Sequence, residues 1–215
     1  MARHDAGLTR RAALKGAAGL VIGLHLPFAA RGQSGPARAG SATFAPNAFI
    51  RIGTDDLVTV LIKHIEFGQG PFTGLATLVA EELDADWTQM RAEHAPSNPV
   101  LYKNLVLGMQ GTGGSSAIAN SYDQMRKAGA TARAMLVKAA ADMWNVAPSE
   151  IVVERGVLRH SATRREGRFG QFAEAAARLP PLEDPPLKQP ASFRLIGREG
   201  AVKKIDVPEK TNGKA

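Results

Sequence analysis

Residues 65–83, IEFGQGPFTGLATLVAEEL, decide how this chain folds. The stretch predicts the end of a strand, a tight Gly-Gln-Gly turn and a helix that begins at once. Pro71 suits the first helical turn, where its missing N–H costs nothing. The apolar positions that follow have helical spacing, at Leu75, Leu78, Val79 and Leu83. The chain therefore changes from strand to helix across Gly-Gln-Gly, and the start of this helix is a candidate binding position.

A β-hairpin is predicted immediately before this stretch. Residues 49–52 form its first strand, residues 53–56 its turn and residues 57–62 its second strand. The second strand is apolar on both faces, which is typical of a strand buried in a sheet. A further strand is predicted after the helix, over residues 90–94.

The second half of the chain alternates helix and hairpin signals. A glycine-bearing loop over residues 98–116 precedes a long helix predicted for residues 118–143, whose apolar stripe includes the small residues Gly129 and Ala132. These would let another backbone approach closely. A second hairpin around Arg155-Gly156, a short helix within residues 170–179 and a short strand at residues 193–197 are also predicted. Hairpins combined with two main helices predict an α+β fold rather than a doubly wound sheet.

Composition limits the classes of function. The 215 residues could form one large domain or two small ones, and a hydrophobic content of 44% is enough to build a core. The absence of cysteine excludes disulfides, iron–sulfur clusters and cysteine-ligated zinc within this chain. Much of the net charge of +7 lies at the N-terminus and in residues 155–168, and only 6% of the residues are aromatic. We therefore expect no nucleic-acid partner.

Residues 1–32 resemble a twin-arginine export signal. Arg10 and Arg11 precede an apolar run over residues 17–26, which is shorter than the about 20 residues that span a bilayer. This pattern predicts export to the periplasm, with an uncleaved membrane anchor as the alternative. Residues 33–45 are small and polar and are interpreted as a linker. The remaining chain divides into a main domain, residues 46–179, and a proline- and charge-rich extended segment, residues 180–215.

Two glycine-bearing stretches supply the candidate binding residues. Gly68 and Gly70 leave the backbone bare before the first main helix, and Gln69 between them has an amide that both donates and accepts. In QGTGGSSA, the residues Gly113, Gly114 and Ser115 repeat this pattern before the second main helix. Unpaired N–H groups at a helix N-terminus can hold a phosphate. Glycines before a helix can also serve only to make a turn, so both interpretations stay open.

No familiar catalytic motif accompanies these stretches. Gly108 and Gly113 have the spacing of a Walker A loop, but Gly114 stands where that loop needs lysine. Neither stretch gives the strand-linked G-x-G-x-x-G turn of a dinucleotide site. His64-Ile65-Glu66 matches the H-x-E of zinc deaminases, whose cysteines this chain lacks. The five histidines show no metal-ligand spacing, so the sequence names neither a catalytic nor a metal-binding residue.

Several segments, taken in order, resemble one enzyme family. They include DDLVTVLIKHIEFGQGPFTGLATLVAEELDADW, EHAP, TGGSSA, RKAGATARAMLVKAAADMW and KKIDVPEKTNGKA. Together they resemble the N-terminal part of the large, molybdopterin-binding subunit of isoquinoline 1-oxidoreductase, in the xanthine dehydrogenase and aldehyde oxidase superfamily. The likeness covers nearly everything after the predicted linker, and the twin-arginine signal suits exported members.

This resemblance implies a molybdopterin cofactor, in the cytosine dinucleotide form common among bacterial members. It implies that Gly68, Gln69 and Gly70 contact the pterin or its pyrophosphate, and that the loop of Gly113, Gly114 and Ser115 passes beside the metal and pterin. The implied reaction hydroxylates an aldehyde or an N-heteroaromatic carbon, with water as the oxygen source. Electrons would leave through a small iron–sulfur subunit with two clusters of the 2Fe-2S type, which agrees with the absence of cysteine here.

The resemblance also implies that the chain is a fragment. Members of the family continue for several times this length, and their general-base glutamate lies in the portion that is missing here. We expect the chain to be inactive alone and to need this C-terminal portion as a partner. Two alternatives stay open. One is a non-catalytic periplasmic module that binds an anion, or a partner through the basic hairpin at Arg164 and Arg165; the other is a degraded gene product that folds poorly.

Overall fold

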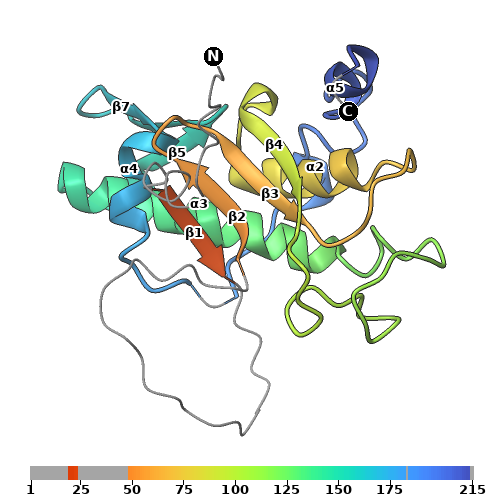
Figure 1. Cartoon of the computed structure of the whole chain (residues 1–215). Coiled ribbons are helices and arrows are strands. Elements are labelled where there is room, and N and C mark those ends of the chain that lie inside the picture. The colour runs from red at the N-terminus through yellow and green to blue at the C-terminus, as the bar shows by residue number, and fades with distance from the viewer. Residues whose placement is uncertain (1–18, 24–47, 183, 214–215) are drawn as a thin grey trace, which may run out of the picture.

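The computed structural model describes residues 19–23, 48–182 and 184–213. The first part of the fold is a four-stranded sheet. The strands are β1 (Gly19–Gly23), β2 (Ala48–Gly53), β3 (Val58–Ile62) and β4 (Met90–His94), in that order across the sheet (Figure 1). β2 and β3 form the predicted antiparallel hairpin. A bond of 2.9 Å from the Gly53 N–H to the Leu57 carbonyl closes its turn.

Strands β3 and β4 are parallel, and helix α2 (Pro71–Leu83) connects them. Parallel neighbours need such a crossover, because the chain must return to the same end of the sheet before it can pair. The loop with Gly-Gln-Gly leaves the end of β3, and a second, longer loop leaves the end of β4. Both loops therefore lie at one end of the sheet, at the right of Figure 1. The sequence pattern predicts β4 but not its parallel pairing, which depends on where α2 packs.

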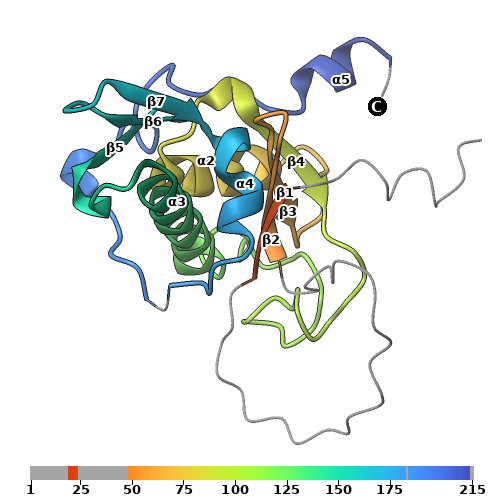
Figure 2. The same ribbon diagram turned by 90° about the vertical axis from the view of Figure 1, so that its left-hand side faces the viewer.

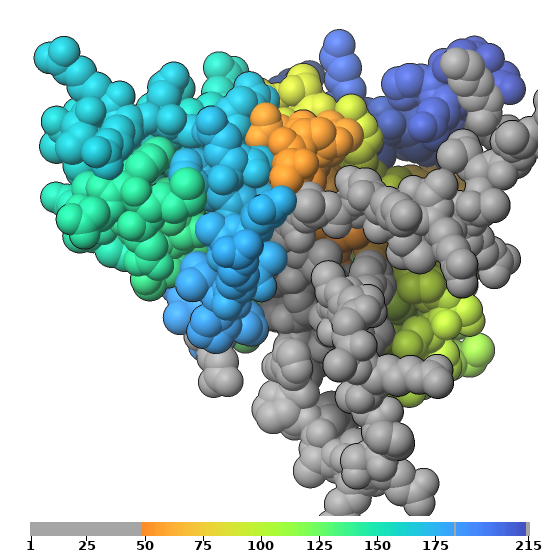
Figure 3. Space-filling model, turned by 60° about the vertical axis from the view of Figure 1, so that its left-hand side comes forward, coloured from red at the N-terminus to blue at the C-terminus, as the bar shows by residue number. Residues whose placement is uncertain are grey.

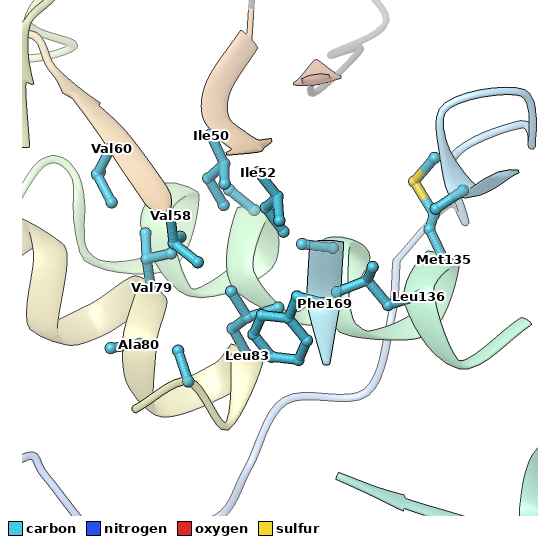
Figure 4. Close-up of a cluster of buried hydrophobic side chains, with 14 of the residues drawn as sticks. Ile50, Ile52, Val58, Val60, Val79, Ala80, Leu83, Met135, Leu136 and Phe169 are labelled. Atoms are coloured by element: carbon cyan, nitrogen blue, oxygen red, sulfur yellow. The ribbon is translucent and has the colours of Figure 1, made fainter. Parts of the chain in front are cut away.

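Helices α2, α3 (Tyr122–Trp144) and α4 (Phe169–Ala176) cover one face of this sheet, which Figure 2 shows nearly edge-on. Side chains alternate between the two faces of a strand, so one face of each strand points toward the helices. Figure 4 shows the buried side chains that meet there, including Ile50, Ile52, Val58 and Val60 from the sheet and Val79, Leu83, Leu136 and Phe169 from the helices. The predicted α+β fold with two main helices is confirmed.

Helices α2 and α3 cross in close contact at Gly129, as the small residues of the α3 stripe predict. A Cβ added at Gly129 would lie 2.6 Å from the Val79 carbonyl oxygen and 3.0 Å from the Cβ of Glu82. Backbone atoms cannot move aside as a flexible side chain can, so only glycine permits this crossing. The contact fixes α3 against α2, and thereby against the sheet.

A second, three-stranded sheet consists of β5 (Ile151–Glu154), β6 (Val157–His160) and β7 (Arg165–Arg168). The predicted hairpin between β5 and β6 turns at Arg155, with φ 48°, and Gly156, with φ 74°. Two successive positive φ values are typical of a type I′ turn, which suits the twist of a hairpin. The sequence pattern does not predict β7, because its four residues carry no apolar side chain.

Helix α4 connects the second sheet to the β2–β3 turn. The Gly170 N–H donates to Asp56 Oδ1 at 2.7 Å, and Arg168 Nε lies 2.7 Å from Asp56 Oδ2. A Cβ at Gly170 would lie 2.5 Å from the Thr54 carbonyl oxygen, so glycine is needed at this contact too. Figure 3 shows the turn, in orange, against the blue residues of α4.

In the described residues 184–213 the chain forms no strand, and the strand predicted at residues 193–197 is wrong. The N–H groups of Arg194, Leu195 and Ile196 all donate to Glu81 Oε2, at 3.0, 2.7 and 3.1 Å. Successive residues of a strand face opposite sides, so three consecutive N–H groups cannot converge on one oxygen in a strand. The last helix is α5 (Val207–Thr211). Three-residue 3-10 turns occur at Trp87–Gln89 (η1), Pro148–Glu150 (η2) and Pro190–Ser192 (η3).

The predicted export signal and linker lie mostly outside the described residues, so the boundaries at residues 32 and 45 stay predictions. Gly19–Gly23, inside the predicted signal, form β1 and pair antiparallel with β2. Among the described residues, no helix combines the length and the apolar character that crossing a membrane requires.

Candidate functional site

The two glycine-bearing loops meet at one end of the first sheet. They follow β3 and β4, whose carboxyl ends lie side by side because these strands are parallel. The Ile65 N–H donates to Thr112 Oγ1 at 2.9 Å, which joins the Gly-Gln-Gly loop to the loop with TGGSS. In open α/β sheets, ligands bind outside the carboxyl ends of the strands. The structure thus brings the two predicted stretches together at a position that suits ligand binding.

Gln69 shapes the loop in which it lies. Its Oε1 accepts the Phe67 N–H at 2.9 Å, and its Nε2 donates to the Ile65 carbonyl at 2.6 Å. Gly68 and Gly70 have φ values of 110° and 93°, a region that residues with a Cβ rarely adopt. The Gln69 residue is nevertheless exposed. The loop is therefore a preformed turn, and its side-chain amide lies at the surface although it is bonded within the turn.

Glu66 binds the N–H groups at the start of α2. Its Oε1 accepts from the Gly68 N–H at 2.7 Å and the Gly70 N–H at 3.2 Å, and its Oε2 accepts from the Phe72 N–H at 3.1 Å. The side chain is 1% exposed. Burial would raise the pKa of Glu66, but the three backbone donors outweigh it, so the pKa lies below its ordinary value. Glu66 is not among the site residues predicted from the sequence. Its position two residues before Gly68 is the feature of the sequence that could have identified it.

Asn104 and Ser116 support the second loop from inside the protein. The Asn104 Nδ2 donates to Ser116 Oγ at 2.7 Å, and this hydroxyl donates to the Gly113 carbonyl at 2.7 Å. Both side chains are buried. Gly114 and Ser115 follow with φ values of 60° and 53°. The predicted residues Gly113, Gly114 and Ser115 are thus held by Ser116, which lies in the same predicted stretch, and by Asn104, which was not predicted from the sequence.

Two buried basic residues follow β3 directly and lie under the loops. His64 is 1% exposed, and its Nε2 lies 3.3 Å from both Ser121 Oγ and Asn120 Nδ2. Burial lowers the pKa of His64, and the positive charge of Lys63 lowers it further. Lys63 Nζ donates to the Lys103 carbonyl at 3.2 Å, and burial lowers the pKa of Lys63 to about 8. Both side chains therefore release a proton more readily than exposed ones.

Exposed apolar side chains gather on the same two loops. Phe67 is 72% exposed and Val106 is 70% exposed. The other exposed large apolar residues of these loops are Ile65, Val100, Leu105, Leu107, Met109 and Ile118. Apolar surface gathered in this way marks a place where a ligand or another protein surface binds.

The glycines of both loops border open space. A Cβ added at Gly68, Gly70, Gly113 or Gly114 would meet no atom within 4 Å. Gly113 does not have a positive φ either, so no contact within the described chain requires glycine there. Bare backbone of this kind suits the close approach of a molecule from outside. Among the described residues, no three histidine, aspartate or glutamate side chains are grouped so that they could hold a metal ion.

Two other surfaces lie apart from these loops. An apolar groove of about 630 Å³ separates α3 from the proline-rich residues 179–182 and 185–186, and none of the predicted site residues lines it. In the basic hairpin, Arg165 donates to the Trp144 carbonyl at 2.6 Å, and Arg168 is paired with Asp56. These two arginines thus make contacts within the protein.

Comparison with known proteins relates the chain to molybdenum enzymes. Residues 5–213 match the family model of the molybdopterin cofactor-binding domain. The chain is 32% identical to the beta subunit of isoquinoline 1-oxidoreductase of Brevundimonas diminuta, over 87% of this chain and 28% of that protein. It is 31% identical to the membrane-bound aldehyde dehydrogenase (pyrroloquinoline-quinone) of Gluconacetobacter polyoxogenes, over 99% of this chain and 28% of that protein. A nicotinate dehydrogenase subunit of Pseudomonas putida is 31% identical over 77% of this chain and 13% of its own length.

Among solved structures, quinoline 2-oxidoreductase from Pseudomonas putida 86 matches 59% of this chain and 15% of its own, with 22% identity and a TM-score of 0.46. The chain thus spans little more than a quarter of the length of the first two relatives, at 28% each.

Proposed function

Because the chain belongs to the molybdopterin cofactor-binding domain family, we propose that its two glycine-bearing loops form part of the cradle of a molybdopterin cofactor. In this proposal Gly68, Gln69 and Gly70 hold the pterin or its pyrophosphate. The loop of Gly113, Gly114 and Ser115 borders the pterin and the metal. The cytosine dinucleotide form of the cofactor is part of the same proposal.

The bare backbone beside Gly113 and Gly114 is the observation that supports this proposal most directly. A Cβ at either position would meet nothing within 4 Å, and neighbouring Thr112 is bonded to the Gly-Gln-Gly loop. A wide planar ligand needs such a surface, because any side chain there would hold it away from the backbone. Phe67 and Met109, which are exposed on the same two loops, could offer apolar contact to a flat ring.

When bound, the cofactor would supply a two-electron oxidation in which a substrate C–H becomes C–OH, water provides the oxygen, and two protons are released. The residues of this chain would bind and orient, since the sequence offers no candidate general base. We propose an aldehyde or an N-heteroaromatic substrate, which are the classes that the names of the relatives contain. We also propose that turnover needs the further length that those relatives have.

A separate small subunit with two iron–sulfur clusters is the proposed electron acceptor. Such clusters are held by cysteine, and this chain has none. We place the assembly in the periplasm, on the strength of Arg10, Arg11 and the apolar run behind them.

The direct test is amide NMR of the purified chain during titration with a soluble 6-substituted pterin. We expect shifts at residues 68–70 and 113–115, and Gly113→Val should remove them without unfolding the chain. Gly114→Leu and Gly108→Leu are a matched pair, because both glycines have a positive φ, border open space and lie in one loop. Only Gly114→Leu should weaken the binding of the pterin. An absence of shifts, or shifts that persist in Gly113→Val, would refute the proposal.

The alternative, a non-catalytic module that binds a partner through its basic hairpin, receives no support from the contacts of that hairpin. Arg165 and Arg168 are bonded within the protein. Charge reversal at Arg164 and Arg165 tests this alternative: it should weaken partner binding if the alternative holds, and should leave the association with other subunits unchanged under the proposed function.

A further inference from the structure

We propose that Glu66 is a positioning residue, whose carboxylate takes the place of an anion at the N-terminus of α2 and leaves the outer side of the Gly-Gln-Gly loop for the ligand. This inference deepens the proposed function and rests on it for the identity of the ligand. It narrows the proposed function, because it leaves the pterin, and not the pyrophosphate, as the group that contacts Gly68, Gln69 and Gly70. The start of α2 then holds no phosphate.

The N–H groups at the start of α2 already have an acceptor within the protein. A helix N-terminus attracts anions because its first N–H groups lack partners within the helix. Here the N–H groups of Gly68, Gly70 and Phe72 donate to Glu66, and Pro71 has no N–H. The carboxylate also brings a negative charge to the positive end of the helix, so a second anion would be repelled.

The two sides of the Gly-Gln-Gly loop differ in their exposure. The Glu66 side chain is 1% exposed and points inward, whereas Phe67 is 72% exposed and Gln69 is exposed. Behind Glu66, Lys210 Nζ of α5 lies 3.9 Å from Glu66 Oε1 and also pairs with Asp206. In the part of the chain that the structure describes, Lys210 thus lies on the Glu66 side of the loop, and Phe67 and Gln69 present the exposed side to a ligand.

Glu66 also fixes the shape of the Gly-Gln-Gly loop. Gly68 and Gly70 could adopt many backbone conformations, because glycine has no Cβ. The bonds from Glu66 hold both N–H groups inward, while Gln69 closes the turn through Phe67 and Ile65. The loop is thus arranged before any ligand binds, which lowers the entropy lost on binding.

The inference is tested with three variants of the full chain: Glu66→Ala, Glu66→Gln and Lys210→Met. The probe is inorganic pyrophosphate, followed through the amide shifts of Gly68, Gly70 and Phe72. The wild type should show no binding at these amides. Glu66→Ala should gain it, with an affinity at least about tenfold above the upper limit that the titration sets for the wild type, because three donors become free. Lys210→Met keeps the carboxylate and should behave as the wild type.

Glu66→Gln guards against a folding defect, because it keeps the size of the side chain. Its carbonyl oxygen can accept at most two of the three N–H groups, so the amide hydrogen exchange of at least one of Gly68, Gly70 and Phe72 should become at least about tenfold faster. Pyrophosphate shifts at these amides in the wild type would overturn the inference, as would unchanged exchange in Glu66→Gln. Both measurements are made without pterin, so their results do not depend on whether the wild type binds pterin. A failure of this inference can therefore be told apart from a failure of the proposed function.

Discussion

Replacing Glu81 should destabilise the fold more than replacing any exposed carboxylate. Glu81 is 1% exposed, and its Oε2 accepts the N–H groups of Arg194, Leu195 and Ile196 at 2.7–3.1 Å. Lys188 Nζ lies 3.3 Å from its Oε1. Each hydrogen bond from a backbone N–H to a charged acceptor contributes about 1.5–3 kcal/mol to stability, and a buried donor that is left without an acceptor costs about 1–3 kcal/mol. In the variant, water can hydrate some of the N–H groups of residues 194–196, which reduces the loss. We therefore expect Glu81→Ala to lower the unfolding free energy by about 3–5 kcal/mol in total.

Urea unfolding followed by tryptophan fluorescence measures this cost. Trp87 suits the purpose because its Nε1 donates to the Lys203 carbonyl at 3.0 Å, close to the segment that Glu81 holds. Glu174→Ala, at an exposed position of α4, is the matched control and should change the unfolding free energy by less than about 0.5 kcal/mol. A loss below about 1 kcal/mol in Glu81→Ala would show that these bonds contribute little, and would refute the reasoning.

The pH dependence gives a second check on Glu81. Burial alone would raise its pKa, but the backbone donors and Lys188 hold the pKa below the ordinary value. A carboxyl whose pKa is lower in the folded state stabilises the protein above its unfolded pKa, and the stabilisation disappears as the pH falls through the folded pKa. The difference in unfolding free energy between the wild type and Glu81→Gln should therefore narrow in acid. A difference that widens below pH 4 would contradict this assignment.

Three further changes test other parts of the structure. Gly129→Ala should cost about 1–3 kcal/mol in urea unfolding, because its Cβ would lie 2.6 Å from the Val79 carbonyl oxygen, and an unchanged midpoint would contradict the close crossing. Lys63→Met should stabilise the fold by about 1–3 kcal/mol at pH 7, because burial lowers the Lys63 pKa to about 8. This gain in unfolding free energy should shrink as the pH rises from 8 to 10.5, because the folded chain loses the Lys63 proton at the lower of these values and the unfolded chain at the higher. A gain that does not change with pH would contradict the prediction. Asn104→Ala leaves Ser116 without its donor and the Val106 and Leu107 N–H groups without their acceptor, and should cost about 1–3 kcal/mol. Hydrogen exchange should become faster in residues 106–107 and 111–116 and stay unchanged elsewhere.

Local periodicity predicts most of the regular elements. The hairpin before Gly-Gln-Gly, the helix that begins at Pro71 and the turn at Arg155-Gly156 each depend on residues within a few positions, and all are present. The close crossing at Gly129 is predicted as well, because a glycine within an apolar helical stripe leaves room for a second backbone. The family, recognised from the order of several segments, is confirmed.

What the sequence does not predict depends on distant partners. Residues 193–197 have the pattern of a strand, but the carboxylate of Glu81 on α2 bends their backbone. β7 is polar and forms because β6 offers it an edge. At the candidate site, Glu66 and Asn104 act through backbone and hydroxyl groups whose direction only the fold determines. The fold brings together the two predicted groups, which are Gly68, Gln69 and Gly70 and the loop of Gly113, Gly114 and Ser115. Their contact with a cofactor stays a prediction.

The contacts of α2 with residues 188–205 have a consequence for the order of events during synthesis. The Ile205 N–H bonds to Thr73 Oγ1 across 132 residues of sequence, and Leu195 bonds to Glu81 across 114. Contacts so far apart in the chain form late, because the entropy of closing a long loop is lost before they contribute. While residues 188–196 are still inside the ribosome, Glu81 has no partner among them. We expect α2, although it is among the first helices to be made, to be among the last to resist a protease on the growing chain.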